Sequence, residues 1–181
     1  MILKLSTVNA TYRLANSADV GSLVELVNGA YRGESGLRGW TTEAHLLGGL
    51  RIDTERVSAL IESEGSLVLI REATTLEACV HLERKDSTSV YLGMLTTNVA
   101  TQSRGVGSSI LKFAEDFAKS EWRAERIEMT VITLRKELID WYVKRGYHVT
   151  NEKRPFPTDP RFGIPLVKGL EFVVLEKALK N

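Results

Sequence analysis

Residues 102–107 form a glycine-interrupted segment, Gln-Ser-Arg-Gly-Val-Gly, between an apolar run at 90–95 and a stretch at 108–119 with apolar residues at helical spacing. A glycine turn that opens a helix presents backbone N–H groups that have no partner within the helix. The helix dipole adds partial positive charge at the same place. The segment therefore predicts a pocket for an anion such as a pyrophosphate.

Two common nucleotide-binding motifs do not fit this turn. A P-loop requires a Lys-Ser or Lys-Thr pair directly after its last glycine, whereas Gly107 is followed by Ser108 and Ser109. A dinucleotide fingerprint requires a third glycine, and Ile110 stands at that position. What remains is Gln-x-x-Gly-x-Gly directly after a predicted strand.

This pattern resembles the acyl-CoA-binding motif of the GNAT superfamily of N-acetyltransferases, written Arg/Gln-x-x-Gly-x-Gly/Ala. Gln102, Gly105 and Gly107 match it, while Val99 stands where the family often has proline. The resemblance covers about residues 10–178, because the order of predicted elements is also the family's order.

Residues 135–147 resemble the second signature of the same family, a helix that ends in Tyr-x-x-x-Gly-Phe/Tyr. Tyr142, Gly146 and Tyr147 match it. Arg135 stands where an asparagine often begins that helix, which puts in question any contact that the asparagine would make.

The resemblance implies acetyl-CoA as co-substrate, held in a cleft where the fourth and fifth strands separate. The backbone of Leu95 and Thr97 would face the pantetheine arm, and Arg104 would either pair with a phosphate or remain solvated. The donor-binding residues that this implies are Leu95, Thr96, Thr97, Gln102, Ser103, Arg104, Gly105, Val106, Gly107 and Ser108.

The reaction that the resemblance implies is attack of an amine on the thioester carbonyl. The departing thiolate needs a proton, and a tyrosine remains protonated at neutral pH and can donate one. Tyr142 matches the family's general acid; without the signature it reads equally well as a core aromatic beside Trp141.

The general base stays open between three side chains and water. His81 is a candidate because histidine titrates near neutrality, and Glu34 and Glu43 lie around the loop between two predicted helices. Each of them also has an ordinary structural reading. We expect no metal site, because His45, His81 and His148 are scattered without ligand spacing.

Two segments, 33–40 and 151–168, lie where this family usually builds its acceptor site. Arginines and aromatics in them could bind a carboxylate-bearing or planar substrate, or could simply fasten long loops. These residues are Arg38, Trp40, Arg154, Phe156, Arg161 and Phe162.

Hydrophobic periodicity and turn residues predict the order of elements along the chain. The expected strands are 12–15, 66–71, 78–82, 89–95, 126–132, 147–150 and 170–175. The expected helices are 17–32, a short one from Thr41 or Thr42 to Leu47, 53–63, 105–120 and 135–145, with an irregular loop at 153–168.

This order together with the resemblance implies an α/β (α+β) fold of the GNAT type in one domain over residues 1–181. We expect a mixed, mostly antiparallel central sheet of about six to seven strands, flanked by helices and splayed between strands four and five.

Composition sets the broad class. The chain has 181 residues and a net charge of +1, which gives no sign of a nucleic-acid or membrane partner. The lone Cys79 lies in an apolar run, so we expect a buried thiol and a cytoplasmic protein. Residues 1–10 do not read as a signal peptide. A homodimer is common in the family that the chain resembles.

The leading interpretation is an enzyme that acetylates the primary amine of a small molecule. Two alternatives remain at this stage: acetylation of a protein lysine or N-terminus, and a non-catalytic regulator that binds acyl-CoA.

Overall fold

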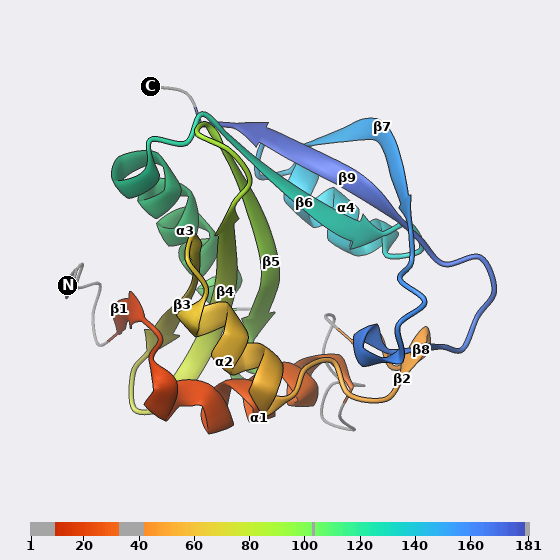
Figure 1. The fold of residues 1–181 in the computed structure, drawn as a ribbon, viewed down its shortest axis with the longest axis horizontal. Coiled ribbons are helices and arrows are strands. Elements are labelled where there is room, and N and C mark those ends of the chain that lie inside the picture. The colour runs from red at the N-terminus through yellow and green to blue at the C-terminus, as the bar shows by residue number, and fades with distance from the viewer. Residues whose placement is uncertain (1–9, 33–41, 103, 180–181) are drawn as a thin grey trace.

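The computed structural model describes residues 10–32, 42–102 and 104–179 (Figure 1). Its helices are α1 (Val20–Tyr31), α2 (Thr54–Glu62), α3 (Val106–Trp122) and α4 (Lys136–Val143), with short 3-10 turns at Ser17–Asp19, Val99–Thr101 and Pro160–Phe162. Its strands are β1 (Thr11–Leu14), β2 (Leu47–Gly48), β3 (Ser66–Glu72), β4 (Leu76–Arg84), β5 (Ser89–Thr97), β6 (Arg126–Ile132), β7 (His148–Pro155), β8 (Ile164–Pro165) and β9 (Glu171–Ala178).

The described residues form a seven-stranded sheet in the order β1-β3-β4-β5-β6-β9-β7. All neighbouring strands in it are antiparallel except β5 and β6, which run parallel. A second, two-stranded sheet pairs β2 with β8. The predicted mixed, mostly antiparallel sheet is therefore confirmed.

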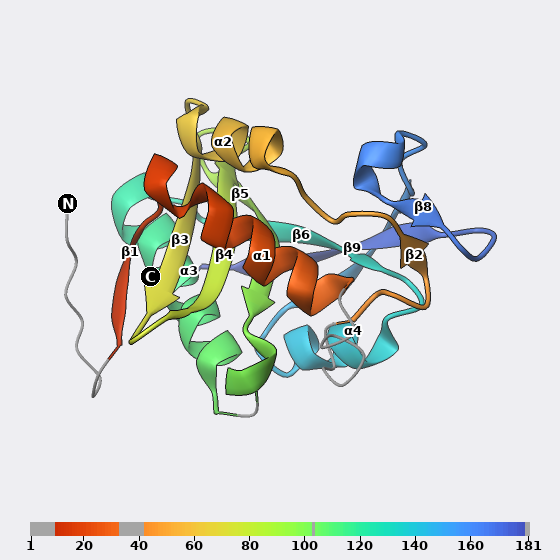
Figure 2. The ribbon, with the colours of Figure 1, turned by 90° about the horizontal axis from the view of Figure 1, so that it is seen from below.

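Helices cover both faces of the main sheet (Figure 2). Because side chains alternate along a strand, Val68 and Ile70 of β3 pack with α1 and α2, whereas Leu69 between them packs with α3 on the other face. The same alternation in β4 sends Cys79 to the first core and Val80 to the second. Each face thus has its own buried layer.

The sheet opens between β5 and β6. Their parallel pairing covers only Ser89–Tyr91 with Arg126–Glu128, although both strands continue. Figure 1 shows the two ribbons diverging beyond that point. The opening lies between the fourth and fifth strands of the main sheet in chain order, where the family resemblance implies it.

A bulge in β5 lies beside the opening. The pairing of β5 with β4 shifts register between His81↔Gly93 and Cys79↔Thr96, so β5 carries an extra residue there. Met94 within the bulge has a φ of +52°, a backbone conformation that residues other than glycine rarely adopt. The bulge therefore redirects the β5 backbone before Leu95.

Two local predictions are wrong. The helix expected up to Leu47 is a single turn, in which the N–H groups of Leu46 and Leu47 donate to the carbonyl of Glu43. Gly48 and Gly49 follow, and Leu47 pairs with Pro165 instead of extending the helix. The expected loop at 153–168 is partly ordered, since β7 continues to Pro155 and β8 lies within it.

The predicted loop at 33–40 lies outside the described residues. Within the part of the chain that is described, no helix is long and apolar enough to cross a membrane.

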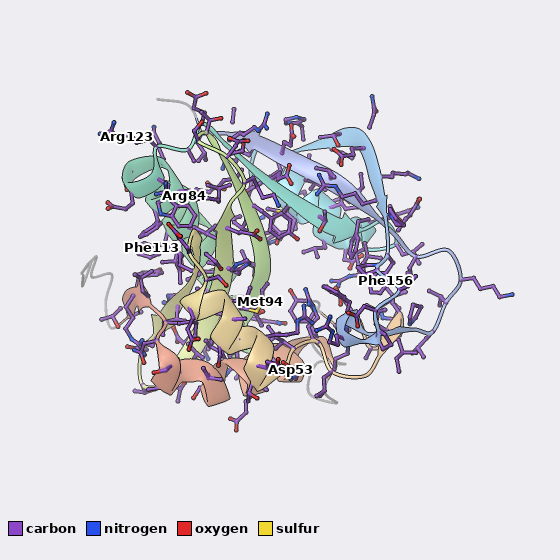
Figure 3. All side chains as sticks on the ribbon, in the orientation of Figure 1. Asp53, Arg84, Met94, Phe113, Arg123 and Phe156 are labelled. Atoms are coloured by element: carbon purple, nitrogen blue, oxygen red, sulfur yellow. The ribbon has the colours of Figure 1, made fainter. Side chains whose placement is uncertain are left out.

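We predict that Arg123→Gly stabilises the protein. Arg123 caps the C-terminus of α3 with a φ of +54° and its side chain is exposed (Figure 3). The left-handed conformation costs a non-glycine residue about 1–2 kcal/mol, so glycine should raise the melting temperature by roughly 2–4 °C. Differential scanning calorimetry measures the shift. Arg123→Ala is the matched control and should give no such gain; an equal gain would mean that loss of the side chain, not relief of strain, is responsible.

Candidate functional site

The glycine turn leads into α3 as its sequence predicts. Gly105 precedes the helix in the left-handed region, with a φ of +76°, a conformation that glycine adopts at little cost. The Ser109 N–H donates to the Gly105 carbonyl at 3.0 Å. The N–H groups of residues 106–108 precede this bond at the start of the helix, where N–H groups have no partner within the helix. The 17-residue length of α3 aligns its peptide dipoles toward this end. The turn therefore has the geometry of an anion site.

A cavity of about 380 Å³ opens over this turn. Most of the predicted donor-binding residues line it: Leu95, Thr97, Gln102, Gly105, Val106, Gly107 and Ser108.

Two of the predicted donor-binding residues that the structure describes, Thr96 and Arg104, do not line this cavity. Thr96 is fully buried, and its hydroxyl donates to the Met94 carbonyl at 3.0 Å. Arg104 is exposed to solvent. Ser103 lies outside the described residues.

Arg145 is a cavity residue that the sequence did not single out. It follows α4, and its guanidinium donates from Nη2 to Ser108 Oγ at 2.7 Å and from Nη1 to the Trp141 carbonyl at 2.8 Å. It also lies 3.5 Å from the centre of the Trp141 ring. Burial lowers its pKa somewhat, yet arginine remains charged at neutral pH. A fixed cation thus stands beside the N-terminus of α3.

Tyr142 is buried at 6% exposure on α4. Its ring packs edge-on against Trp141 and Tyr147, with centroid distances of 4.9 and 5.5 Å. Tyr147 is anchored in turn by a hydrogen bond from its hydroxyl to Glu115 at 3.0 Å. Burial raises the pKa of Tyr142 well above its usual value, so the phenol stays protonated at neutral and mildly alkaline pH.

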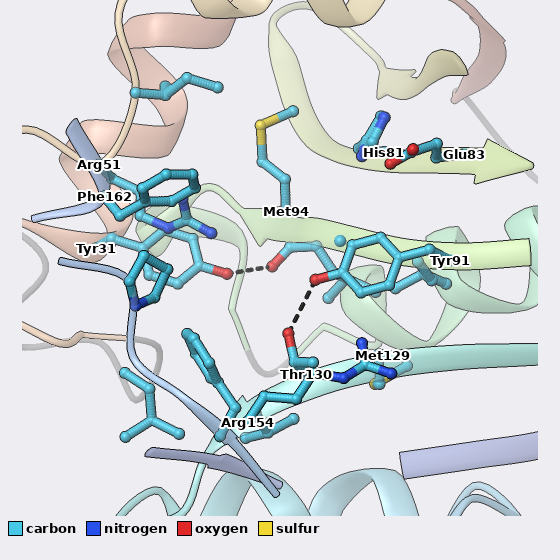
Figure 4. A pocket seen from close by; sticks show the side chains of 18 of the residues that line it. Tyr31, Arg51, His81, Glu83, Tyr91, Met94, Met129, Thr130, Arg154 and Phe162 are labelled. Atoms are coloured by element: carbon cyan, nitrogen blue, oxygen red, sulfur yellow. Dashed lines mark hydrogen bonds between the residues drawn. The ribbon is translucent and has the colours of Figure 1, made fainter. Parts of the chain in front are cut away.

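Tyr142 also lines a second cavity, of about 500 Å³. Figure 4 shows side chains that line this second cavity. It is bounded by α2, β4, β5 and β6 and by the segment that leads from β7 to Phe162. Both cavities share four lining residues: Tyr31, Leu95, Leu138 and Tyr142. The two spaces therefore meet where β5 and β6 separate.

Tyr31 fixes this junction. Its hydroxyl donates to the Leu95 carbonyl at 2.8 Å, which ties the end of α1 to the bulged part of β5. Burial raises the pKa of Tyr31 to about 12, so this donor also stays protonated. Nothing in its helical spacing distinguishes Tyr31 from an ordinary core residue, so the sequence does not reveal its role.

Tyr91 and Thr130 connect the two diverging strands. Their hydroxyls lie 2.9 Å apart (Figure 4). Tyr91 is the last paired residue of β5, and Thr130 follows two residues after Glu128, the last paired residue of β6. Both side chains line the second cavity.

The two predicted bases within the described residues, His81 and Glu43, have different surroundings. His81 lines the second cavity, is 5% exposed, and its Nε2 lies 2.8 Å from Ser66 Oγ. Burial lowers the pKa of His81 to about 4, so the imidazole is neutral at pH 7. Glu43 also lines the cavity, whereas Glu34 lies outside the described residues. Glu83, two residues after His81 on the same face of β4, lines the cavity as well and was not predicted.

Glu43 lies between two arginines. Its carboxylate is 2.9 Å from Arg32 and 3.9 Å from Arg135. Arg135 is 1% exposed and its Nε also donates to Glu137 at 2.5 Å. The residue that departs from the family's asparagine therefore helps to hold Glu43 at the cavity wall.

The four predicted acceptor residues that the structure describes divide into two groups. Arg154 and Phe162 line the second cavity. Phe156 instead packs against Phe172, with ring centres 5.3 Å apart, and Arg161 pairs with Asp159 on the surface. Arg38 and Trp40 lie outside the described residues. Two further arginines that the sequence analysis did not select, Arg51 and Arg56, also line this cavity.

Among the described residues, no group of three or more His, Cys, Asp or Glu side chains is arranged to hold a metal ion.

A family model described as the acetyltransferase (GNAT) family matches residues 27–147. The match includes both the glycine turn and Tyr142, and it covers more than half of the chain. The chain belongs to the GNAT acetyltransferase family.

Solved structures share the GNAT fold of this chain over nearly its whole length. The protein yncA from Salmonella typhimurium, solved with its cofactor acetyl-CoA, has a TM-score of 0.69 at 18% identity, covering 96% of each chain. The ribosomal-protein-S18-alanine N-acetyltransferase from Escherichia coli has a TM-score of 0.68 at 11% identity, covering 95% of each chain.

A chimera of the spermidine N-acetyltransferase SpeG from Vibrio cholerae and hSSAT has a TM-score of 0.67 at 13% identity, covering 95% of this chain and 96% of its own. No curated protein sequence matches the chain. Because these identities are low, the comparisons with solved structures establish the fold and leave the acceptor open.

We predict that His81 makes the protein less stable in mild acid. The unfolded chain binds a proton on this histidine near its ordinary pKa of 6.5, whereas the folded chain does so only near pH 4. Stability should therefore fall as the pH drops from about 6.5 to about 4, by on the order of 1–3 kcal/mol from this group. Urea unfolding at several pH values measures the slope.

His81→Gln retains a hydrogen-bonding group toward Ser66 but does not titrate, so its stability should depend less on pH than that of the wild type. His148→Gln, at an exposed histidine, is the control. Parallel pH curves for His81→Gln and the wild type would contradict the assignment.

Proposed function

We propose that the protein is an acetyl-CoA-dependent N-acetyltransferase that moves an acetyl group to the primary amine of a small molecule by direct attack. The observation that carries this proposal is the junction of two cavities at Tyr142. One cavity has an anion site for the donor, and the other has room for an acceptor. A reaction between two bound molecules needs such a meeting point.

The first cavity fits the pyrophosphate of acetyl-CoA. The N–H groups at the start of α3 and the guanidinium of Arg145 point to the same region, and anions bind well at such helix ends. A Cβ at Gly105 would meet no other atom within 4 Å, so the approach to the turn is open. Acetyl-CoA in the structure of the Salmonella typhimurium neighbour supports the same donor.

The backbone of Leu95 and Thr97 leads from this anion site toward the junction, where the thioester carbonyl would lie. In the reaction the amine nitrogen forms a bond to the carbonyl carbon, and the carbon–sulfur bond breaks. Tyr142 would donate its phenolic proton to the departing sulfur, since burial keeps that proton in place.

The proton of the amine must leave toward the second cavity. Glu43, His81 and Glu83 line this cavity and can accept a proton directly or through water. His81 has the lone pair free of a proton at pH 7, but with a pKa of about 4 it is a weak base on its own. Carboxylic acids ordinarily titrate in the same range, so the proposal leaves the base open between these three side chains and a water-mediated route.

We place this activity in the cytoplasm as part of the proposal, which is consistent with Cys79 as a fully buried free thiol. A homodimer remains a prediction from the family resemblance.

Release of free CoA thiol from acetyl-CoA in the presence of an amine panel tests the function. Transfer to at least one small amine is the expected result. Tight CoA binding without release for any amine or peptide would favour a non-catalytic acyl-CoA-binding protein, and release with peptides alone would favour a protein acetyltransferase.

We predict that Tyr142→Phe lowers turnover about 100-fold or more, because general acid catalysis typically contributes that much. The change removes only the hydroxyl, so the affinity for CoA should stay within about twofold, well under the tenfold that 1.4 kcal/mol would produce. Steady-state rates and calorimetric titration with CoA measure the two effects. Tyr147→Phe is the matched control, because its hydroxyl bonds to Glu115 and lines neither cavity. Unchanged turnover in Tyr142→Phe would remove this residue from the mechanism.

We also predict that Gly107→Ala weakens CoA binding at least about tenfold, because a methyl group beside the helix N–H groups obstructs a phosphate. The new Cβ would lie 3.4 Å from Thr97 and 3.6 Å from Trp141, which the fold accommodates. The melting temperature should therefore not fall. Gly21→Ala is the control for the change in helix propensity, because Gly21 lies in α1 and a Cβ there would meet no atom within 4 Å. Normal CoA affinity in Gly107→Ala would place the donor elsewhere.

A further inference from the structure

Most charged residues of the acceptor cavity are neutralised by partners. Glu43 pairs with Arg32 and Arg135, and Glu83 lies 3.9 Å from Lys85. Arg154 bonds to Glu152 and Glu128, at 2.6 and 3.3 Å. These contacts leave little net charge on that part of the wall.

Arg51 and Arg56 are the exception. Both are half-buried and line the cavity, and neither forms an ion pair with a carboxylate of the described residues. Asp53 and Asp159 act on Arg56 only through space. Burial and the nearby Arg51 together lower the pKa of Arg56, as expected for two cations that share one poorly solvated region.

Aromatic rings hold both guanidinium groups in place. Arg51 lies over the Tyr31 ring at 5.5 Å, and Arg56 lies over the Phe162 ring at 4.5 Å and donates to the Arg161 carbonyl at 2.6 Å. Stacking of this kind occupies the flat face of a guanidinium and leaves N–H edges for another acceptor. Figure 4 shows Arg51, Tyr31 and Phe162 grouped at one end of the cavity, away from His81 and Glu83.

The position of Arg51 relative to the junction sets the size of the ligand. The Tyr31 ring that Arg51 covers carries the hydroxyl that bonds to Leu95, and both Tyr31 and Leu95 line the junction of the two cavities. A group bound by Arg51 would thus lie one tyrosine side chain away from the reacting atoms. This span suits a short molecule with an anionic group at one end and an amine at the other.

We propose that the acceptor is a small amine that carries a carboxylate, as amino acids do, and that Arg51 and Arg56 bind this carboxylate. The inference rests on the proposed function and specifies its substrate class. Planar arginine side chains match carboxylates in paired hydrogen bonds, and an anion here would offset the repulsion between the two cations. A polyamine would instead bring further positive charge to this end of the cavity, which is unfavourable.

The experiment compares acceptors that differ only in the carboxylate. L-methionine is paired with L-methioninamide and L-phenylalanine with L-phenylalaninamide; phosphoethanolamine, putrescine and spermidine complete the panel. With the wild type, we expect kcat/KM to be at least about tenfold higher for the acid of a pair, since a hydrogen bond to a charged group contributes a factor of this order. Equal or higher values for the amides or polyamines would overturn the inference while leaving the proposed function intact, and a preference for phosphoethanolamine would replace the carboxylate with a phosphate.

Arg51→Gln should raise KM for the acid about 10- to 100-fold and leave KM for the amide nearly unchanged. Arg51→Lys keeps the charge but not the paired geometry, so its KM for the acid should lie between those of the wild type and Arg51→Gln. Arg84→Gln is the matched control: it also removes one positive charge, but Arg84 stacks on Trp122 and lines neither cavity. An equal loss for acid and amide in Arg51→Gln would mean that Arg51 has a structural role only.

A binding measurement separates the two proposals. The products N-acetyl-L-methionine and N-acetyl-L-phenylalanine retain the carboxylate and require no catalysis. Calorimetry should show that they bind the wild type and bind Arg51→Gln at least about tenfold more weakly. If no amine is acetylated but this Arg51-dependent binding is present, the catalytic proposal fails and the carboxylate site stands. If neither the KM for the acid nor the affinity for the acetylated product depends on Arg51, the proposed carboxylate site is wrong.

Discussion

The separation of β5 from β6 is the constraint on which the rest of this structure depends. Parallel strands are normally paired along their length, because unpaired backbone groups are costly when buried. Here pairing ends at Tyr91 and Glu128, and the freed edges face cavities instead of each other. The bulge at Met94 and the bond from Tyr31 to Leu95 keep β5 in its redirected course. Without this opening the two cavities could not meet.

Burial sets the protonation state of the groups around that opening. It raises the pKa values of Tyr142 and Tyr31, which keeps both phenols as donors, and it lowers that of His81, which keeps the imidazole neutral. The acetyl-CoA cavity is therefore lined by a phenol that keeps its proton, and the amine cavity is lined by groups that are free to accept a proton. One physical effect, exclusion of water, thus produces opposite shifts that both suit transfer of an acetyl group to an amine.

Charge is distributed unevenly around the acceptor cavity. Buried charges are costly unless they are paired, and Glu43 is paired with Arg32 at 2.9 Å and with the fully buried Arg135 at 3.9 Å. Arg51 and Arg56 are held by aromatic rings instead of carboxylates. The cavity thus combines a neutralised wall with a cationic end, and this asymmetry carries the inference about the acceptor.

The sequence by itself determined the features that depend on neighbours along the chain. The glycine turn before α3, the spacing of Tyr142 and Gly146, and the alternation that separates the two cores are all local patterns, and the family and fold class follow from them. The expected helix up to Leu47 failed because its competitor, pairing with β8, comes from residues more than a hundred positions away.

Only the tertiary structure decided which side chains meet. Arg145 reaches Ser108 across 37 positions, and Tyr31 reaches Leu95 across 64. The sequence analysis did not select Arg51 and Arg56; their stacking and their lack of carboxylate partners among the described residues appear only once the chain is folded. The physical reason is that helix and turn propensities act over a few residues, whereas the pairing of charges and the shape of a cavity depend on packing between distant segments.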